Sequence, residues 1–256
     1  MEAILERIAK NTEPKSSFQI IVSDNQTRFQ TKFNPPIQLD KDKKYEIALV
    51  NLETYYSFPN IDSTNNVFKY SADKGKTWNE IHIQEGSYDV VDLNDTIQQK
   101  MKLNGHFDSI NDDYYITISA NSNTLRSILS VETDYQVDFG TTNSIGSVLG
   151  FGRHVYTKPY NESEGVVNIL SINSILVNID IITGSYVRGN TQPTIYSFFP
   201  NVSPGYKIIE NPVNLVYLPI TIDTIYKLGV TLTDQNGKQL NLRGENLTIR
   251  FHIREV

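Results

Sequence analysis

The residues of this chain that could do catalytic or metal chemistry are few and scattered. None of its four histidines has a second histidine or a cysteine at the spacing that metal sites use. They are His82, His106, His154 and His252. Gly146-Ser147 and Gly184-Ser185 both lack the second glycine of a nucleophile elbow, and no glycine-rich phosphate loop occurs. The sequence therefore predicts no catalytic residue and no nucleotide-binding site.

Carboxylates occur in a row only between Asp108 and Asp113. This stretch lacks the alternating ligands, the central glycine and the distal glutamate of a Ca²⁺-binding loop, so a solvated hairpin loop is the prediction. His82 and His252 fall at polar positions of predicted strands, where a solvated face is expected. We therefore predict no metal, no cofactor and no enzymatic activity.

Aromatic residues gather instead in predicted turns and loops. One interpretation is that they cap the ends of a hydrophobic core. The other is that they form a contact surface, because Tyr and Phe are enriched at the centres of protein interfaces. The aromatic candidates for a subunit interface are Tyr55, Tyr56, Phe58, Tyr196, Phe198, Phe199 and Tyr206.

Residues 1–17 differ from the rest of the chain. Ile4, Leu5 and Ile8 share one stripe of a predicted short helix, and the sequence after Asn11 breaks that pattern. The segment is interpreted either as a frayed end or helix lying on the body, or as an arm that docks on a neighbouring subunit. A short amphipathic helix needs a partner surface to be stable, so these three residues join the interface candidates.

The last thirty residues carry the clearest strand pattern. Apolar side chains alternate with polar ones from Leu228 to Leu232 and again from Leu247 to Ile253, which puts each apolar set on one face of a strand. Asp234-Gln-Asn-Gly237 and Arg243-Gly-Glu-Asn246 are turn signals. The pattern predicts a terminal β-meander whose apolar face must cover another sheet.

The remaining elements indicate an all-β antiparallel jelly-roll sandwich with one or two short helices in insertions. About ten strands are predicted, with a capped helix between Asp89 and Asn104 and a single short helix in residues 143–150. Long loops at irregular spacing favour a jelly roll over an immunoglobulin-type sandwich. No linker or repeat divides the chain, so residues 18–256 are predicted to form one jelly-roll domain with loop insertions.

Composition limits the partners and the compartment. The formal net charge is -6, with 23 Lys and Arg against 29 Asp and Glu, and this balance does not favour direct nucleic-acid binding. The chain has no cysteine, which fits folding in a reducing compartment. No secretory signal and no membrane-spanning run is predicted.

Five stretches together resemble a known group of proteins. They are residues 45–61 (YEIALVNLETYYSFPNI), 144–151 (SIGSVLGF), 168–189, 193–220 and 232–253 (LTDQNGKQLNLRGENLTIRFHI). The chain resembles the jelly-roll capsid proteins of Polinton/Maverick elements and adintovirus-like viruses. Because it has room for one jelly roll, it looks most like the penton, or minor capsid, protein. The resemblance implies a homopentamer at the virion vertices that contacts the major capsid protein and assembles inside the host cell.

Two other classes of function are compatible with the same fold. The sandwich could be an attachment module that holds a host glycan in its loops, in a spike or in a domesticated genomic copy. A cupin-like enzyme would need a His/Glu metal cluster, which the sequence lacks. Self-association separates the capsid interpretation from the glycan-binding one.

Overall fold

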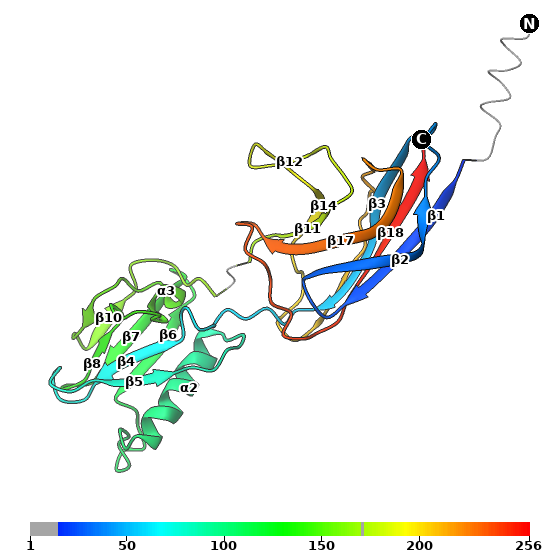
Figure 1. Cartoon of the computed structure of the whole chain (residues 1–256). Helices are drawn as coiled ribbons and strands as arrows, with labels where there is room; N and C mark the ends of the chain where they lie inside the picture. Colours follow the sequence, from blue (N-terminus) through cyan, green and yellow to red (C-terminus); the bar gives the residue numbers. More distant parts are fainter. Residues whose placement is uncertain (1–14, 170–171) are drawn as a thin grey trace, which may run out of the picture. The chain divides into compact units, whose positions relative to one another are not determined.

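The computed structural model describes residues 15–169 and 172–256, which form two compact units (Figure 1). The sandwich unit consists of the chain up to Ser57 and from Ile172 onward, and the insertion unit is Phe58–Ser171. The sequence predicted one jelly-roll domain with loop insertions over residues 18–256. The insertion has its own hydrophobic core and its own sheets, so it is a compact unit rather than a loop.

The sandwich unit contains two antiparallel sheets and a small hairpin. Sheet A has the order β1 (Ser17–Asp24), β18 (Leu247–Glu255), β3 (Tyr45–Tyr55) and β15 (Lys207–Glu210), and β16 (Leu218–Pro219) also pairs with β3. Sheet B has the order β14 (Thr194–Phe198), β11 (Ile175–Ile179), β17 (Thr224–Asp234) and β2 (Arg28–Gln38). The hairpin pairs β12 (Ser185–Val187) with β13 (Asn190–Gln192).

The core of the sandwich unit comes from the alternating apolar residues of both sheets. Leu247, Ile249, Phe251 and Ile253 of β18 have no exposed surface. Leu228, Val230 and Leu232 of β17 are equally buried. Each such side chain contributes about 1.5–3 kcal/mol through burial, and only the face-to-face packing of two sheets can bury both sets.

The predicted terminal meander is wrong, because β17 and β18 lie in different sheets. β17 pairs with β2 and β11, whereas β18 pairs with β1 and β3. Leu240 and Leu242, which lie between the two predicted turns, are buried in the connection between the two sheets. Their carbonyl oxygens accept hydrogen bonds from Thr27 Oγ1 (2.6 Å) and Ser57 Oγ (2.7 Å).

The chain crosses repeatedly between sheets A and B in the sandwich unit. β1 belongs to sheet A, β2 to sheet B and β3 to sheet A, and the chain crosses again after β14, β16 and β17. Two packed antiparallel sheets with this connectivity are typical of a jelly roll. The predicted fold class, an all-β jelly-roll-like sandwich, is confirmed.

The insertion unit contains two further antiparallel sheets and both described helices. One sheet has the order β10 (Tyr160–Glu162), β7 (Arg126–Val131) and β6 (Ile116–Asn121). The other has the order β5 (Asn79–His82), β4 (Val67–Ser71), β8 (Gln136–Asp138) and β9 (Val155–Tyr156). The helices are α2 (Val90–Leu103) and α3 (Gly146–Leu149). Their buried side chains join Phe68, Tyr70 and Phe139 in one core.

The helix α2 begins and ends where the sequence predicts. Asp89 accepts a hydrogen bond from the Asp92 backbone N–H, and Asp92 accepts one from the Asp89 N–H, so the two residues form a capping box. Leu93, Ile97 and Met101 lie on the buried face of the helix. The helix therefore closes one side of the insertion core.

The two ends of the insertion unit are tied to each other. Asn60 Nδ2 donates to the carbonyl oxygens of Tyr88 (2.6 Å) and Ile169 (3.2 Å). Asn60 lies just after the chain enters the unit, and Ile169 lies just before it leaves. The entry and exit of this unit are thus neighbours in space.

Candidate functional site

His106, His154 and His252 make contacts that have a structural role. Over residues 15–169 and 172–256, no three His, Asp or Glu side chains come together as a metal site would require. His106 Nδ1 lies 2.7 Å from the Tyr70 hydroxyl, and His154 stacks on the Tyr156 ring with centroids 4.1 Å apart. His82 is exposed on β5, as its polar strand position predicted.

His252 forms a polar network on the outer face of sheet A. Its Nε2 lies 2.5 Å from Ser17 Oγ, and its Nδ1 lies 2.7 Å from the Tyr217 hydroxyl. Arg254 stacks over the Tyr217 ring at 3.5 Å and forms an ion pair with Glu46 at 3.1 Å. These contacts connect β1, β18, β3 and the segment before β16. The histidine therefore ties strands together on an exposed strand face.

A second polar cluster fixes a loop of the insertion unit. The Tyr156 hydroxyl donates to Glu164 at 2.8 Å, and the Gly152 N–H donates to the same carboxylate at 2.7 Å. Burial raises the pKa of Tyr156, and its hydrogen bond to Glu164 raises it further. His154 Nε2 lies 3.6 Å from Glu164. The cluster holds the loop around β9 and β10.

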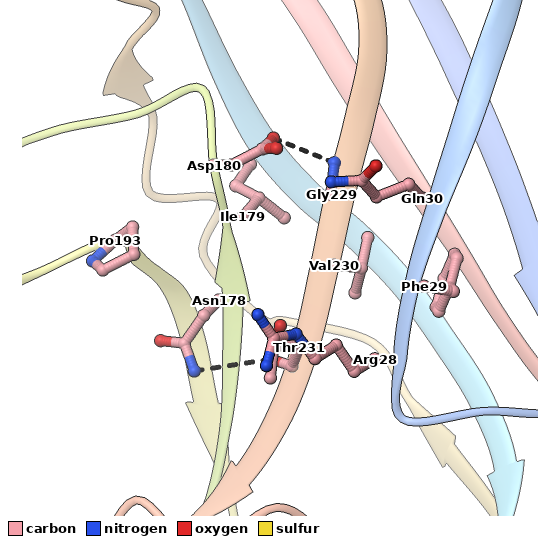
Figure 2. Close-up of a pocket in the computed structure, with 10 residues that line it drawn as sticks. All are labelled: Arg28, Phe29, Gln30, Asn178, Ile179, Asp180, Pro193, Gly229, Val230 and Thr231. Carbon is pink, nitrogen blue, oxygen red and sulfur yellow. Dashed lines mark hydrogen bonds between the residues drawn. The ribbon is translucent and has the colours of Figure 1, made fainter.

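The outer face of sheet B carries a polar groove of about 590 Å³ (Figure 2). Asp180 follows the last residue of β11, and its Oδ1 accepts the Gly229 N–H at 2.9 Å. A Cβ at Gly229 would lie 2.5 Å from Asp180 Oδ2, so the missing side chain lets the carboxylate reach the strand. The Asp180 side chain thus extends the ladder beyond β11, which is a structural role.

A second, more apolar groove of about 660 Å³ lies beside the β12–β13 hairpin. Tyr186 and Val216 line it and are 74% and 61% exposed, while Leu176 and Ile195 at its base are buried. Neither groove brings a nucleophile and a base together.

The predicted interface residues fall into four groups. Tyr55, Phe199 and Tyr206 are exposed by 40%, 51% and 68% and remain candidates. Tyr196 is half-buried, and its hydroxyl donates to Glu210 at 2.7 Å. Ile4, Leu5 and Ile8 lie outside the described residues.

The fourth group consists of three predicted interface residues that have little exposed surface. Tyr56, Phe58 and Phe198 are 7%, 3% and 8% exposed, so they pack within the chain instead of presenting a contact surface. Phe198 pairs with Ile175 in sheet B. These three follow the alternative interpretation, in which loop aromatics cover the core.

One exposed apolar side chain near Tyr55 and Tyr206 was not among the predicted interface residues. Ile209 of β15 is 56% exposed, while the adjacent Ile208 is buried. Lys207 pairs with Tyr55 and Ile209 pairs with Glu53 in the β15–β3 ladder, so all four lie on the outer face of sheet A. We call Tyr55, Tyr206 and Ile209 the β15 surface. The signal was present in the sequence, because two consecutive isoleucines in one strand cannot both face the core.

Charge is divided unevenly between the two units. The insertion unit has 8 Lys and Arg against 15 Asp and Glu, a formal charge of -7, whereas the rest of the chain has 15 against 14, or +1.

Of the helices in the described part of the chain, none has the length and hydrophobicity that a membrane crossing requires.

The comparison with known proteins rests on structure. No protein-family model matches the sequence, and no curated protein sequence matches it either. The crystal structure of the selenomethionine-labelled mavirus penton protein is similar over 94% of this chain and 100% of that chain. The TM-score is 0.50 and the sequence identity is 11%. A likeness at this identity concerns the fold, and because it covers 94% of the chain it includes both units. The fold of this chain is therefore similar to that of the mavirus penton protein.

Proposed function

We propose that this protein is a structural capsid protein that forms homopentamers at the virion vertices and contacts the major capsid protein. The observation that carries the proposal is the likeness to the mavirus penton protein, which spans that entire chain and nearly all of this one. The role needs no enzymatic activity and no cofactor, and we propose none. It also needs no direct contact with nucleic acid.

The surface of the sandwich unit supports this role. A ring of identical subunits requires that one flank of a subunit bind the opposite flank of the next, which is a heterologous contact. Tyr55, Phe199 and Tyr206 offer exposed aromatic area for such a contact. By this proposal the protein resides in the virion after assembly inside the host cell.

Solution mass tests the proposal directly. Light scattering of the purified full chain is expected to give five times 29.1 kDa at high concentration, and negative-stain images should show five-fold rings. Replacing Tyr206 by Ser should weaken the pentamer, whereas replacing Tyr160, which is 59% exposed in the insertion unit, should leave it unchanged. A chain that stays monomeric and is retained on a glycan array would contradict the pentamer and support the attachment function.

A further inference from the structure

Sheet A is open at both of its edges. The strand order places β1 at one edge and β15 at the other, and no described strand pairs with the outer side of either. Sheet B differs, because its edge strand β2 carries Pro35 and Pro36 together with Arg28 and Lys32. Prolines and cations on an edge strand prevent further pairing. Sheet A is therefore the sheet that can grow in both directions.

The free backbone groups of these edges follow from the hydrogen bonds that each edge strand makes with its neighbour. The Glu255 N–H donates to the Ser16 carbonyl, so alternate residues from Ser16 onward bond to β18. The antiparallel alternation then leaves the N–H and C=O groups of Ser17, Gln19, Ile21 and Ser23 directed outward. β1 has no proline, and its single charged residue, Asp24, is at its end. An eight-residue edge of this kind is a template for another strand.

The opposite edge has the same property. The Tyr56 N–H donates to the Tyr206 carbonyl, so by alternation the backbone groups of Lys207 and Ile209 point away from β3. β1 and β15 run in opposite directions, because three antiparallel pairings separate them. Two copies standing in the same orientation would thus bring β15 of one beside β1 of the other as an antiparallel pair.

The side chains beside the two edges are compatible with this pairing. Ile21 is 57% exposed and lies on the outer face of sheet A, between the buried Ile20 and Val22. The β15 surface (Tyr55, Tyr206 and Ile209) lies beside the other edge, with Tyr55 and Ile209 on that same outer face. Apolar side chains on adjacent strands of one face stabilise the pair.

We infer that the occupant of the β1 edge is a second copy of this chain, whose β15 continues sheet A from one subunit to the next. The inference rests on the proposed pentamer and names the strands that form its contacts. A contact between opposite edges of one sheet is heterologous, so it generates a ring where the rotation between subunits closes, and not a two-fold dimer.

Engineered cysteines test this inference, because the chain has none of its own. The full chain with Gln19→Cys and Lys207→Cys, both at exposed positions, is treated with a short bismaleimide. Denaturing gels should show a ladder of linked subunits that ends at the pentamer. The two single variants and the pair Gln19→Cys/Ala120→Cys, whose second cysteine lies in the insertion unit, should stay unlinked.

A proline variant tests the backbone pairing. Gln19→Pro removes one outward N–H and spares the bonds to β18, so the chain should keep its circular dichroism spectrum while each subunit contact weakens at least about fivefold. Gln19→Ala should leave the pentamer intact. A pentamer without the Gln19–Lys207 cross-link overturns the strand assignment and leaves the proposed function standing. Linked dimers of the Gln19→Cys single variant overturn it as well, and a persistent monomer overturns both.

Discussion

Single residues decide where the insertion unit can turn. Gly150 ends α3 with a φ of +82°, in the left-handed region that favours glycine. A Cβ at this position would overlap the carbonyl oxygens of Gly165 and Val166. Gly105 has the same φ of +82° and nothing within 4 Å of its Cβ position. Alanine substitutions at the two glycines therefore distinguish the free-energy cost of a left-handed backbone from the additional cost of steric overlap.

Replacing Gly150 by Ala should destabilise the insertion unit by about 2–4 kcal/mol, because strain and overlap add. Gly105→Ala should cost only about 1 kcal/mol. The fluorescence of Trp78, the single tryptophan of the chain, follows denaturant unfolding of this unit in both variants. Equal costs would show that the overlap with Gly165 has no effect.

Asp73 should make the stability of the same unit depend on pH. Hydrogen bonds from the Thr77 side chain and backbone and from Ser71 lower the pKa of Asp73 to about 2. Because the folded-state pKa lies below the unfolded value of about 3.9, the extra stability is present above pH about 4 and is lost as the pH falls toward about 2. Asp73→Asn should therefore lower the unfolding midpoint at pH 6, and the difference from the native chain should vanish near pH 2. A difference that is constant over this range would contradict the assignment.

Secondary-structure elements show how far the sequence can predict the fold. Alternation and capping located most strand and helix positions, since these signals depend only on neighbouring residues. The sheet to which each strand belongs was not predictable. The sequence of β17 has the same apolar alternation whether β18 pairs with it in one sheet or packs against it from the other sheet. The exposure of loop aromatics was not predictable either. Tyr55 and Tyr56 are adjacent in the sequence, yet only Tyr55 is exposed.

The cap of α2 gives a test at this scale. Asp89→Ala removes the acceptor for the Asp92 N–H, which lies 2.7 Å from Asp89 Oδ1, and should cost about 1 kcal/mol. Asp95→Ala, in the same helix but without a capping role, should cost much less. Both are measured by urea unfolding with Trp78 fluorescence. A similar loss in the two variants would contradict the capping role.

The whole molecule is organised around two cores. The sequence showed no linker, and the division became visible only when burial separated Leu93 and its neighbours from the residues between sheets A and B. Short connections and continuous hydrophobic patterning hide such a boundary from sequence patterns. The unfolding of this protein should therefore depart from a single two-state transition.

Core truncations should move two separate transitions. Leu93→Ala in the insertion unit and Ile249→Ala in the sandwich unit remove fully buried side chains, and each should cost about 2–5 kcal/mol. Calorimetry should show that each variant shifts a different peak, and Trp78 fluorescence should follow only the Leu93 variant. A single peak that both variants shift equally would contradict separate cores.

The hydrogen bond from Asn60 to the Ile169 carbonyl has a consequence beyond stability. The insertion unit begins and ends at neighbouring points. It can therefore be replaced by another domain without separating the strands of the sandwich unit that flank it. Any folded domain whose own ends lie close together could occupy the same position between β3 and β11 without changing the register of either sheet. Replacing residues 58–171 in this way would change the surface of the molecule while leaving sheets A and B intact.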